Sequence, residues 1–321
     1  MENRISGIIM QGVGGLYLVR ILSGSQEDNN ICIGDTVPCR ARGSFRHGNI
    51  SPLPGDRVII SPADENGGKE GQNGAFVIEE ILERSNSLIR PPMANLDFLF
   101  ITMSASAPKP VLSTVDKLIC ISEFNKIEPI IVITKCELDQ DYATTLKEIY
   151  EKSGFTVFSL SAIDDVGIQP LDDFIKENLK EKTAAFAGAS GIGKSTLLNR
   201  LFPDLSLSTS EISRKIQRGR HTTRKVELYP LSSDLNCGYI ADTPGFSMLD
   251  FERFDFFEKD DLPLTMREFS DYIGKCKYTK CSHTKEEGCA VIEAVRNNDI
   301  PKSRHESFCE IYDVLKAKKK W

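Results

Sequence analysis

The sequence lacks the features that would mark a membrane-spanning, secreted or generally nucleic-acid-coating protein. No apolar run approaches the ~18 residues that a membrane helix needs, so no membrane partner is expected. The first four residues lack the basic start and apolar core of a signal peptide, which favours a cytoplasmic protein. Lys and Arg total 40 against 46 Asp and Glu. The resulting net charge of −6 argues against a general nucleic-acid coat but is compatible with a local basic surface.

Disulfide bonds are also not expected. Nine cysteines without a secretion signal indicate a reducing compartment, where clustered cysteines bind metal more often than they form disulfides. Three of them form a cluster with a histidine: Cys276, Cys281, His283 and Cys289. Three thiolates and an imidazole make a closed tetrahedral set, which predicts one structural Zn²⁺ rather than four unrelated residues. The remaining six cysteines lie apart and are interpreted as isolated thiols: Cys32, Cys39, Cys120, Cys136, Cys237 and Cys309.

Residues 1–92 have the pattern of a small β-barrel. Short apolar segments between Gly and Pro turns predict strands and no helix: Ile5–Met10, Leu16–Ile21, Ile31–Ile33, Val37–Ala41, Arg57–Ile60 and Phe76–Leu82. A five-stranded OB-like barrel fits this length, and such barrels commonly bind single-stranded or structured RNA. A modest cluster of basic and aromatic residues is either an RNA-binding patch or a solvated edge strand: Arg40, Arg42, Phe45, Arg46 and His47.

Residues 93–250 alternate between strand and helix patterns, which predicts a parallel sheet covered on both faces. The predicted strands are Leu96–Met103, Pro129–Ile133, Thr156–Ser159, Ala184–Ala187, Val226–Leu231 and Tyr239–Ala241. The predicted helices are Ser113–Asn125, Tyr142–Ser153, Leu171–Leu179 and Ser195–Leu201. Two further helices are predicted after this segment, at Ala290–Asn297 and Pro301–Lys318, followed by a basic tail that is interpreted as a solvated helix end.

One loop fits the phosphate-binding P-loop pattern G-x-x-x-x-G-K-[ST]. Its residues are Gly188, Ala189, Ser190, Gly191, Ile192, Gly193, Lys194, Ser195 and Thr196. The glycines let backbone N–H groups face anionic oxygens, Lys194 brings a cation to the β- and γ-phosphates, and Ser195 offers a hydroxyl to Mg²⁺. The strand before the loop and the helix after it favour phosphate binding over a glycine-rich turn with a chance lysine.

Two later segments extend the nucleotide-site pattern. Asp242-x-x-Gly245 matches D-x-x-G at the carboxyl end of a strand, where Asp242 can hold Mg²⁺ and the Gly245 N–H can face the γ-phosphate. The basic loop 214–225 contains G-R-H-T-T, and either Thr222 or Thr223 is expected to close on Mg²⁺ and the γ-phosphate. The six cations of this loop are expected either to bind RNA phosphates or to remain solvated.

A third segment points to guanine as the base. Thr134-Lys135-Cys136-Glu137 stands where a GTPase carries N-K-x-D, with Thr134 in place of Asn and Glu137 in place of Asp. The Glu137 carboxylate can accept from guanine N1–H and N2–H₂, which adenine does not offer. Ser161-Ala162 follows at a spacing that suits a loop at the base edge. The alternatives are an exposed Lys–Glu pair and a P-loop ATPase in which this segment has no role.

The order of the motifs is the most specific feature of the chain. The base-reading segments precede the P-loop, and D-x-x-G follows it, whereas in an ordinary GTPase the P-loop comes first. A parallel sheet does not depend on chain order if the former termini lie close together. This order, with G-R-H-T-T and D-T-P-G-F, resembles the circularly permuted GTPases that depend on the small ribosomal subunit, the RsgA family, also called YjeQ or YloQ. The resemblance covers essentially the whole chain.

The resemblance implies an N-terminal OB-fold in residues 1–92, a circularly permuted α/β P-loop GTPase in 93–250, and a helical zinc-binding domain in 251–321. It implies GTP hydrolysis to GDP and phosphate, late in assembly of the bacterial small ribosomal subunit, stimulated by that subunit. The expected partners are the small subunit with its rRNA, GTP and GDP, and the chain is expected to be a monomer. The alternative from a different class is an rRNA-binding assembly factor that uses GTP mainly as a conformational lock.

The residue that orients the attacking water in many GTPases is missing. A glutamine commonly follows D-x-x-G, but this position holds Phe246, which forms no side-chain hydrogen bond. Intrinsic hydrolysis is therefore expected to be slow. The resemblance suggests that His221, in the basic loop, orients the water once the ribosome orders that loop; the alternative is that His221 only packs or contacts RNA.

Overall fold

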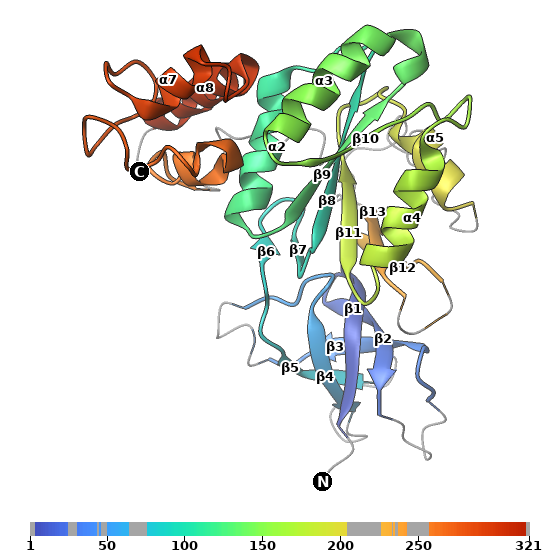
Figure 1. Ribbon diagram of the computed structural model, residues 1–321. Helices are drawn as coiled ribbons and strands as arrows, with labels where there is room; N and C mark the ends of the chain where they lie inside the picture. Colours follow the sequence, from blue (N-terminus) through green and yellow to red (C-terminus); the bar gives the residue numbers. More distant parts are fainter. Residues whose placement is uncertain are drawn as a thin grey trace, which may run out of the picture. The chain divides into compact units, whose positions relative to one another are not determined.

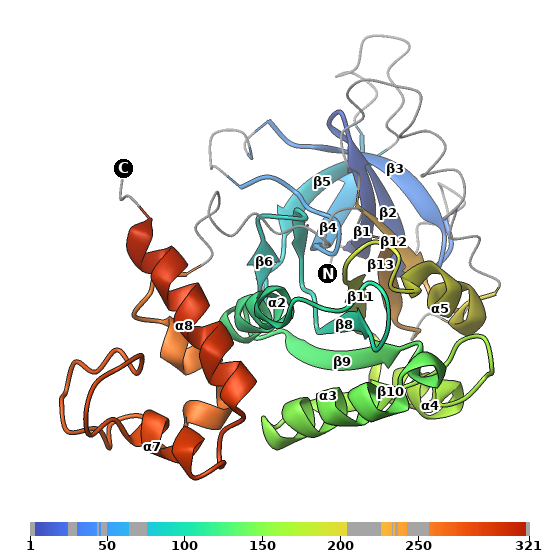
Figure 2. The ribbon, with the colours of Figure 1, turned by 90° about the horizontal axis from the view of Figure 1, so that it is seen from above.

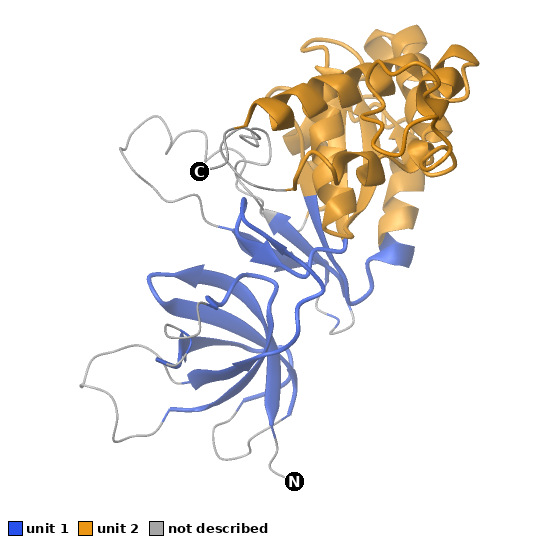
Figure 3. Ribbon diagram, turned by 90° about the vertical axis from the view of Figure 1, so that its left-hand side faces the viewer, with its two compact units in different colours: residues 1–97, 176–185, 204–245 blue, residues 98–175, 186–203, 246–321 orange. Residues whose placement is uncertain are grey.

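The computed structural model describes residues 4–24, 31–43, 45, 50–63, 76–203, 226–232, 234, 237–242 and 257–318. The chain forms two compact units (Figure 3). One unit contains residues 1–97, 176–185 and 204–245, and the other contains 98–175, 186–203 and 246–321. Each unit is thus assembled from segments that lie far apart in the sequence. No helix of the described part is long and apolar enough to cross a membrane.

The first unit contains a closed five-stranded barrel (Figure 1). Its strands are β1 (Ile5–Val13), β2 (Leu16–Ser23), β3 (Thr36–Ala41), β4 (Arg57–Pro62) and β5 (Phe76–Ile81). They follow the order β1-β2-β3-β5-β4, and β4 pairs again with β1. The β3–β5 pair is parallel and the other pairs are antiparallel. This confirms the OB-like barrel, and β3 with its Arg40 is paired on both sides rather than lying at an edge.

The barrel core follows from the alternation of apolar residues along its strands. Ile9, Val19, Ile21 and Val58 are fully buried, because successive side chains of a strand point to opposite faces. The turn between β1 and β2 is only Gly14-Gly15, because β1 continues to Val13, beyond the predicted end at Met10. Both glycines have positive φ, 59° and 83°, as a two-residue hairpin requires.

The strand predicted at Ile31–Ile33 is wrong. Only Ile31 forms an isolated bridge, and the next residues make a turn. The Cys32 N–H donates to the Asp35 carboxylate at 2.8 Å, and the Asp35 N–H donates back to the Cys32 carbonyl at 3.1 Å. These local bonds, with Gly34 at a φ of 95°, replace the ladder bonds of a strand.

The same unit also holds β12 (Glu227–Pro230), β13 (Tyr239–Asp242) and the first three residues of β11 (Thr183–Ala187), the strand that leads to the P-loop. β11 and β13 are parallel, β12 and β13 are antiparallel, and β12 joins β1 through one pair, Glu227 with Gln11. A short hairpin of β6 (Ser87–Leu88) and β7 (Met93–Ala94) was not predicted from the sequence.

The second unit contains a parallel sheet in the order β10-β9-β8. Its strands are β8 (Phe98–Ser104), β9 (Glu128–Thr134) and β10 (Thr156–Ser159). Helix α2 (Leu112–Phe124) lies on one face, and α3 (Gln140–Lys152) and α4 (Ile168–Asn178) lie on the other (Figure 2). Every residue of β8 is buried, as expected for a strand covered on both faces. The predicted alternation of strands and helices is confirmed, with small differences at the ends of the elements.

The C-terminal part of the second unit is built from short helices and loops. It contains two 3₁₀ helices, η3 (Leu262–Thr265) and η4 (Arg267–Phe269), followed by α7 (Ala290–Arg296) and α8 (Lys302–Ala317). Helix α8 packs against α2. The predicted basic tail continues beyond Lys318 into residues outside the described part.

Candidate nucleotide and metal sites

The P-loop connects β11 to helix α5 (Lys194–Leu201) in a backbone conformation that requires glycine. Gly188, Gly191 and Gly193 have φ values of 148°, 80° and 94°. A Cβ atom at Gly188 would also lie 2.4 Å from the Thr102 carbonyl oxygen of β8. The Leu197 N–H donates to the Gly193 carbonyl at 3.0 Å, so the helix begins directly after the last glycine. A tight loop opening a helix N-terminus is the arrangement that binds phosphates.

The Thr134 side chain braces the P-loop. Its Oγ1 lies 2.5 Å from the Ile192 carbonyl oxygen and 3.1 Å from the Met103 carbonyl oxygen, and it donates its one proton to these acceptors. Thr134 is 2% exposed. The hydroxyl therefore holds the carboxyl end of β9 against the P-loop and the end of β8.

Lys135 makes a second connection to the same loop. Its Nζ donates to the Gly191 carbonyl at 2.8 Å and to the Ala107 carbonyl at 2.7 Å. Lys135 adopts a left-handed backbone conformation with a φ of 58°, which is uncommon outside glycine. The ammonium group and the strained backbone together fix three loops that start at the carboxyl ends of β8, β9 and β11.

The two predicted base-reading segments lie beside each other. The Cys136 N–H donates to the Leu160 carbonyl at 3.3 Å, and the Leu160 N–H donates to the Ile133 carbonyl at 2.8 Å. Glu137 has one carboxylate oxygen, Oε2, that is buried and has no hydrogen-bond partner. A buried carboxylate oxygen without a donor is costly, so this atom calls for a hydrogen-bond partner.

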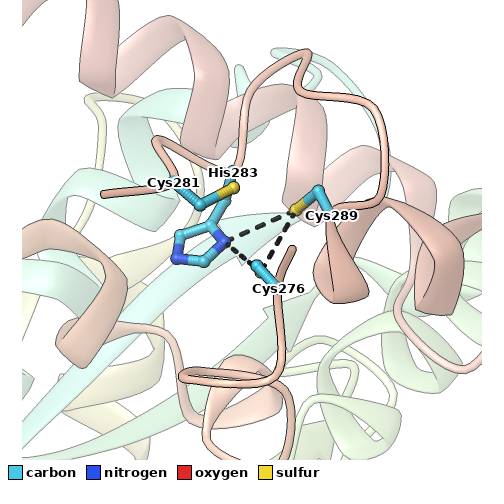
Figure 4. Close-up of side chains that lie close together, drawn as sticks. All are labelled: Cys276, Cys281, His283 and Cys289. Carbon is cyan, nitrogen blue, oxygen red and sulfur yellow. Dashed lines mark hydrogen bonds between the residues drawn. The ribbon is translucent and has the colours of Figure 1, made fainter. Parts of the chain in front are cut away.

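The cysteine cluster has the dimensions of a tetrahedral metal site. The Sγ atoms of Cys276 and Cys289 are 3.8 Å apart, and each lies 3.5 Å from Nδ1 of His283 (Figure 4). Metal–ligand bonds of zinc length imply tetrahedral edges of about 3.8 Å between sulfurs and about 3.6 Å from sulfur to nitrogen. Together with Cys281, all four ligand atoms lie within 4.8 Å of one another. The cluster is thus compatible with zinc binding.

Two family descriptions match the chain: RsgA GTPase over residues 81–252 and RsgA N-terminal domain over residues 6–69. This chain belongs to the RsgA GTPase family. Its relatives include the small ribosomal subunit biogenesis GTPase RsgA of Ruminiclostridium cellulolyticum, 40% identical, covering 97% of this chain and 93% of that protein. The protein of the same name from Caldanaerobacter subterraneus subsp. tengcongensis is 38% identical, covering 99% and 98%.

Two solved structures support the same assignment. YjeQ from Thermotoga maritima has a TM-score of 0.77 and 31% identity, covering 98% of this chain and 100% of that one. YloQ, a circularly permuted GTPase, has a TM-score of 0.72 and 32% identity, covering 100% and 98%. The family resemblance, the OB-like barrel and the circularly permuted GTPase fold predicted from the sequence are therefore confirmed.

Several predicted site residues lie outside the described part of the chain. They are Gly245 and Phe246, the side chain of Asp242, and the whole basic loop 214–225 with its His221, Thr222 and Thr223. Arg46 and His47 of the barrel patch also lie outside it. Phe45 packs against the barrel core, and Arg42 forms a partly exposed ion pair with Glu79 at 2.8 Å.

Sequence reasoning missed Glu286, which organises the loop 276–289 of the candidate metal cluster, called the metal loop below. The Glu286 carboxylate accepts from the N–H and hydroxyl of Ser282 at 2.8 and 2.5 Å, and from the N–H groups of Thr284 and Lys285, both at 3.2 Å. Burial alone would raise the pKa of Glu286, but these hydrogen bonds outweigh it and lower the pKa to about 2. A glutamate between two metal ligands carries no distinct sequence signal.

Proposed function

We propose that this chain hydrolyses GTP to GDP and phosphate in the biogenesis of the small ribosomal subunit, and that the subunit stimulates its turnover. The observation that carries the proposal is the direct bracing of the P-loop by Thr134 and Lys135 of the base-side segment. Phosphate-binding and base-binding segments joined in this way favour a nucleotide over a lone anion. The names of the relatives supply the small ribosomal subunit as the setting.

Guanine is the proposed base. Lys135, held along the P-loop, offers its stem to one face of the base, and Ser161-Ala162 offers the base edge its backbone. The buried, unpartnered Oε2 of Glu137 supports this assignment, because guanine N1–H and N2–H₂ supply the missing donors. Adenine has no donor pair in this position and would leave the carboxylate unsatisfied. In this proposal Thr134 supports nucleotide binding by holding the P-loop and does not contact the base.

The phosphates are assigned to Lys194 and to the backbone N–H groups of the P-loop. Ser195 and Asp242 are assigned to Mg²⁺, which would neutralise charge on the β- and γ-phosphates when bound. Thr222 or Thr223 would close on the γ-phosphate, and the Gly245 N–H would report its presence. The arrangement of glycines at positions 188, 191 and 193 is the structural support for the phosphate part of this assignment.

Stimulation by the subunit is assigned to His221. Because Phe246 forms no side-chain hydrogen bond, the water needs another group to orient it, and the family resemblance suggests His221 in the basic loop for this role. His221→Ala should retain basal turnover and lose most of the subunit-stimulated turnover. Unchanged stimulated turnover would remove His221 from the mechanism.

The metal cluster is proposed to hold one structural Zn²⁺ through Cys276, Cys281, His283 and Cys289. We also propose three domains, at residues 1–92, 93–250 and 251–321, in a monomer that acts in the cytoplasm. The tetrahedral dimensions of the cluster support zinc. We expect elemental analysis to find one equivalent of zinc in the wild type. The double variant Cys276→Ser/Cys289→Ser should have lost it.

The decisive experiment measures GTP turnover with and without purified small ribosomal subunits. We expect slow intrinsic turnover that rises by orders of magnitude with subunits, competition by GDP, and no competition by ATP. Competition by ATP equal to that by GTP would favour a P-loop ATPase. If Lys194→Ala abolished turnover without slowing release from the subunit, hydrolysis would have no role in release, and a nucleotide-locked assembly factor would be the better description.

A further inference from the structure

An ion pair joins the loop at the base side of the proposed site to the helix that follows the P-loop. Arg200 lies in the last turn of α5 and contacts Asp165 of the 161–167 loop through two hydrogen bonds. Its Nε donates to one carboxylate oxygen at 3.0 Å, and its Nη2 donates to the other at 2.6 Å. Two parallel bonds between a planar guanidinium and a carboxylate fix orientation as well as distance.

The loop that carries Asp165 is held in one conformation at its base. Ser161 and Val166 exchange two backbone hydrogen bonds, at 2.9 and 3.1 Å. A Cβ at Gly167 would lie 2.4 Å from the Ser159 carbonyl oxygen, so this position requires glycine. Asp165 at the tip has a φ of 61°, a left-handed conformation that is uncommon outside glycine but that aspartate tolerates better than most residues. The contact with Arg200 adds a fixed partner to this tip.

Helix α5 connects Arg200 to the P-loop, the proposed phosphate-binding loop. It begins at Lys194, directly after the last P-loop glycine, and its Leu197 is fully buried. Arg200 is therefore fixed relative to Lys194 by less than two helical turns. The ion pair thus links the P-loop helix to the loop that begins with Ser161-Ala162.

We propose that Arg200 and Asp165 are positioning residues that place the Ser161-Ala162 backbone against the edge of the guanine base. The inference rests on the proposed function, because it needs Ser161-Ala162 to read that edge. Neither residue touches the nucleotide in this role. The pair couples base recognition to phosphate binding through α5, in parallel with the coupling through Thr134 and Lys135.

The exposure of the pair sets the size of the expected effect. The side chains of Arg200 and Asp165 are 53% and 56% exposed, and exposed ion pairs contribute little to folding. The hydrogen bonds from Arg200 lower the pKa of Asp165, so the carboxylate is charged throughout the neutral range. Loss of the pair should therefore alter base selectivity more clearly than stability.

The test compares Asp165→Arg, Arg200→Asp and the exchanged double variant in the full-length protein. Dissociation constants for GDP and ADP are measured for each by fluorescence competition, with thermal unfolding as a check on folding. Each single variant should bind GDP about two- to tenfold more weakly, with ADP binding unchanged, and the double variant should recover much of the loss. Asp165→Asn gives a milder change if either reversal fails to fold.

Glu151→Gln is the matched control. It removes an ion pair of similar exposure on α3, Lys147 with Glu151 at 3.7 Å, outside the proposed site, and should leave both dissociation constants unchanged. If GDP affinity is unaltered in both single variants, the positioning role of Arg200 and Asp165 is overturned, while the proposed guanine site stands. Equal weakening of GDP and ADP without recovery in the double variant also overturns it. A wild-type protein with no preference for GDP over ADP overturns the proposed guanine site, and the inference with it.

Discussion

At the scale of single residues, the hydroxyl of Thr134 forms a hydrogen bond with the backbone of the P-loop. In the N-K-x-D pattern this position is an asparagine, whose amide has several donors and acceptors. The threonine hydroxyl has one proton and two carbonyl acceptors, on Ile192 and Met103, in a fully enclosed position. Thr134 thus bridges β9 and the P-loop with a small side chain.

Thr134→Val removes this bridge while keeping the shape of the side chain. The buried Ile192 carbonyl oxygen loses its side-chain donor, which should cost about 1–3 kcal/mol of stability. Because this oxygen belongs to the P-loop, GDP affinity should fall by about tenfold. Urea unfolding and GDP titration check the two effects. Thr134→Ser, which keeps the hydroxyl, is the control; an equal loss of affinity in both variants would show that the hydroxyl is not responsible.

At the scale of elements, Arg304 joins α8 to the helix and loop that it packs against. Its side chain is fully buried and donates to Asp116 of α2 and to Glu268 of η4, the latter at 2.6 Å. The guanidinium also lies 5.3 Å from the Phe155 ring centroid. Burial alone would lower the pKa of Arg304, but the two carboxylates outweigh it and raise the pKa well above its usual value.

Arg304→Met leaves two carboxylates buried without their cation, which should lower the free energy of unfolding by about 3–5 kcal/mol. Lys302→Met on the same helix is the control, because its pair with Glu306 is exposed and should contribute about 0–1 kcal/mol. Urea unfolding of both variants measures the difference. Equal stabilities for the two variants would contradict the anchoring role of Arg304.

The metal loop (residues 276–289) is held in its conformation by the Glu286 carboxylate, which accepts hydrogen bonds from the loop. The pKa of Glu286 is lowered to about 2 from an ordinary value of 4.5. A carboxylate with a depressed pKa stabilises the fold above its unfolded-state pKa, and this contribution is lost only as the pH falls through about 4.5 toward 2. Between pH 6 and 8 its contribution is therefore constant.

Glu286→Gln should accelerate zinc release to a chromogenic chelator by about tenfold, because the loop loses a charged acceptor for four donors. The ratio of release rates between the variant and the wild type should be the same at pH 6, 7 and 8. Glu287→Gln, next to it and exposed, is the control and should release zinc at the wild-type rate. A ratio that changes steeply across this range would show that Glu286 titrates there.

At the scale of the whole molecule, the reactivity of one buried thiol in each compact unit shows whether that unit is folded. Cys39 lies in the barrel core of the first unit, and Cys120 lies on α2 of the second. Burial raises the pKa of both thiols to about 12. Since the thiolate is the reactive form, neither should react in the native state, whereas the exposed Cys32 should.

Chelation of the metal should expose Cys120 and leave Cys39 protected. Cys120 contacts Met266 at 3.8 Å between sulfurs, and Met266 belongs to the C-terminal segment that holds the metal cluster. Iodoacetamide labelling at pH 8, followed by peptide mass spectrometry, should show faster modification of Cys120 after chelation. Equal acceleration at Cys39 would indicate a loss of folding throughout the chain rather than in the C-terminal segment.

The sequence by itself determined the chemistry of the motifs and their order. The P-loop, the T-K-x-E segment, D-x-x-G and the cysteine cluster are local patterns, and the alternation of apolar residues predicted nearly all strands and helices. The β6–β7 hairpin was missed, and the strand predicted at Ile31–Ile33 was wrong because local hydrogen bonds to Asp35 make a turn there. The permuted order was also readable, since it depends only on the sequence of motifs.

The tertiary structure alone decided which residues support those motifs. Arg304 and Asp116 are separated by 188 residues, Thr134 and Ile192 by 58, and Arg200 and Asp165 by 35. Their partnerships arise because strands distant in the chain end at the same edge of a sheet and because α8 folds back on α2. No local pattern encodes such pairs, so an ordinary threonine, arginine or aspartate acquires its role only when the fold brings its partner within hydrogen-bond distance.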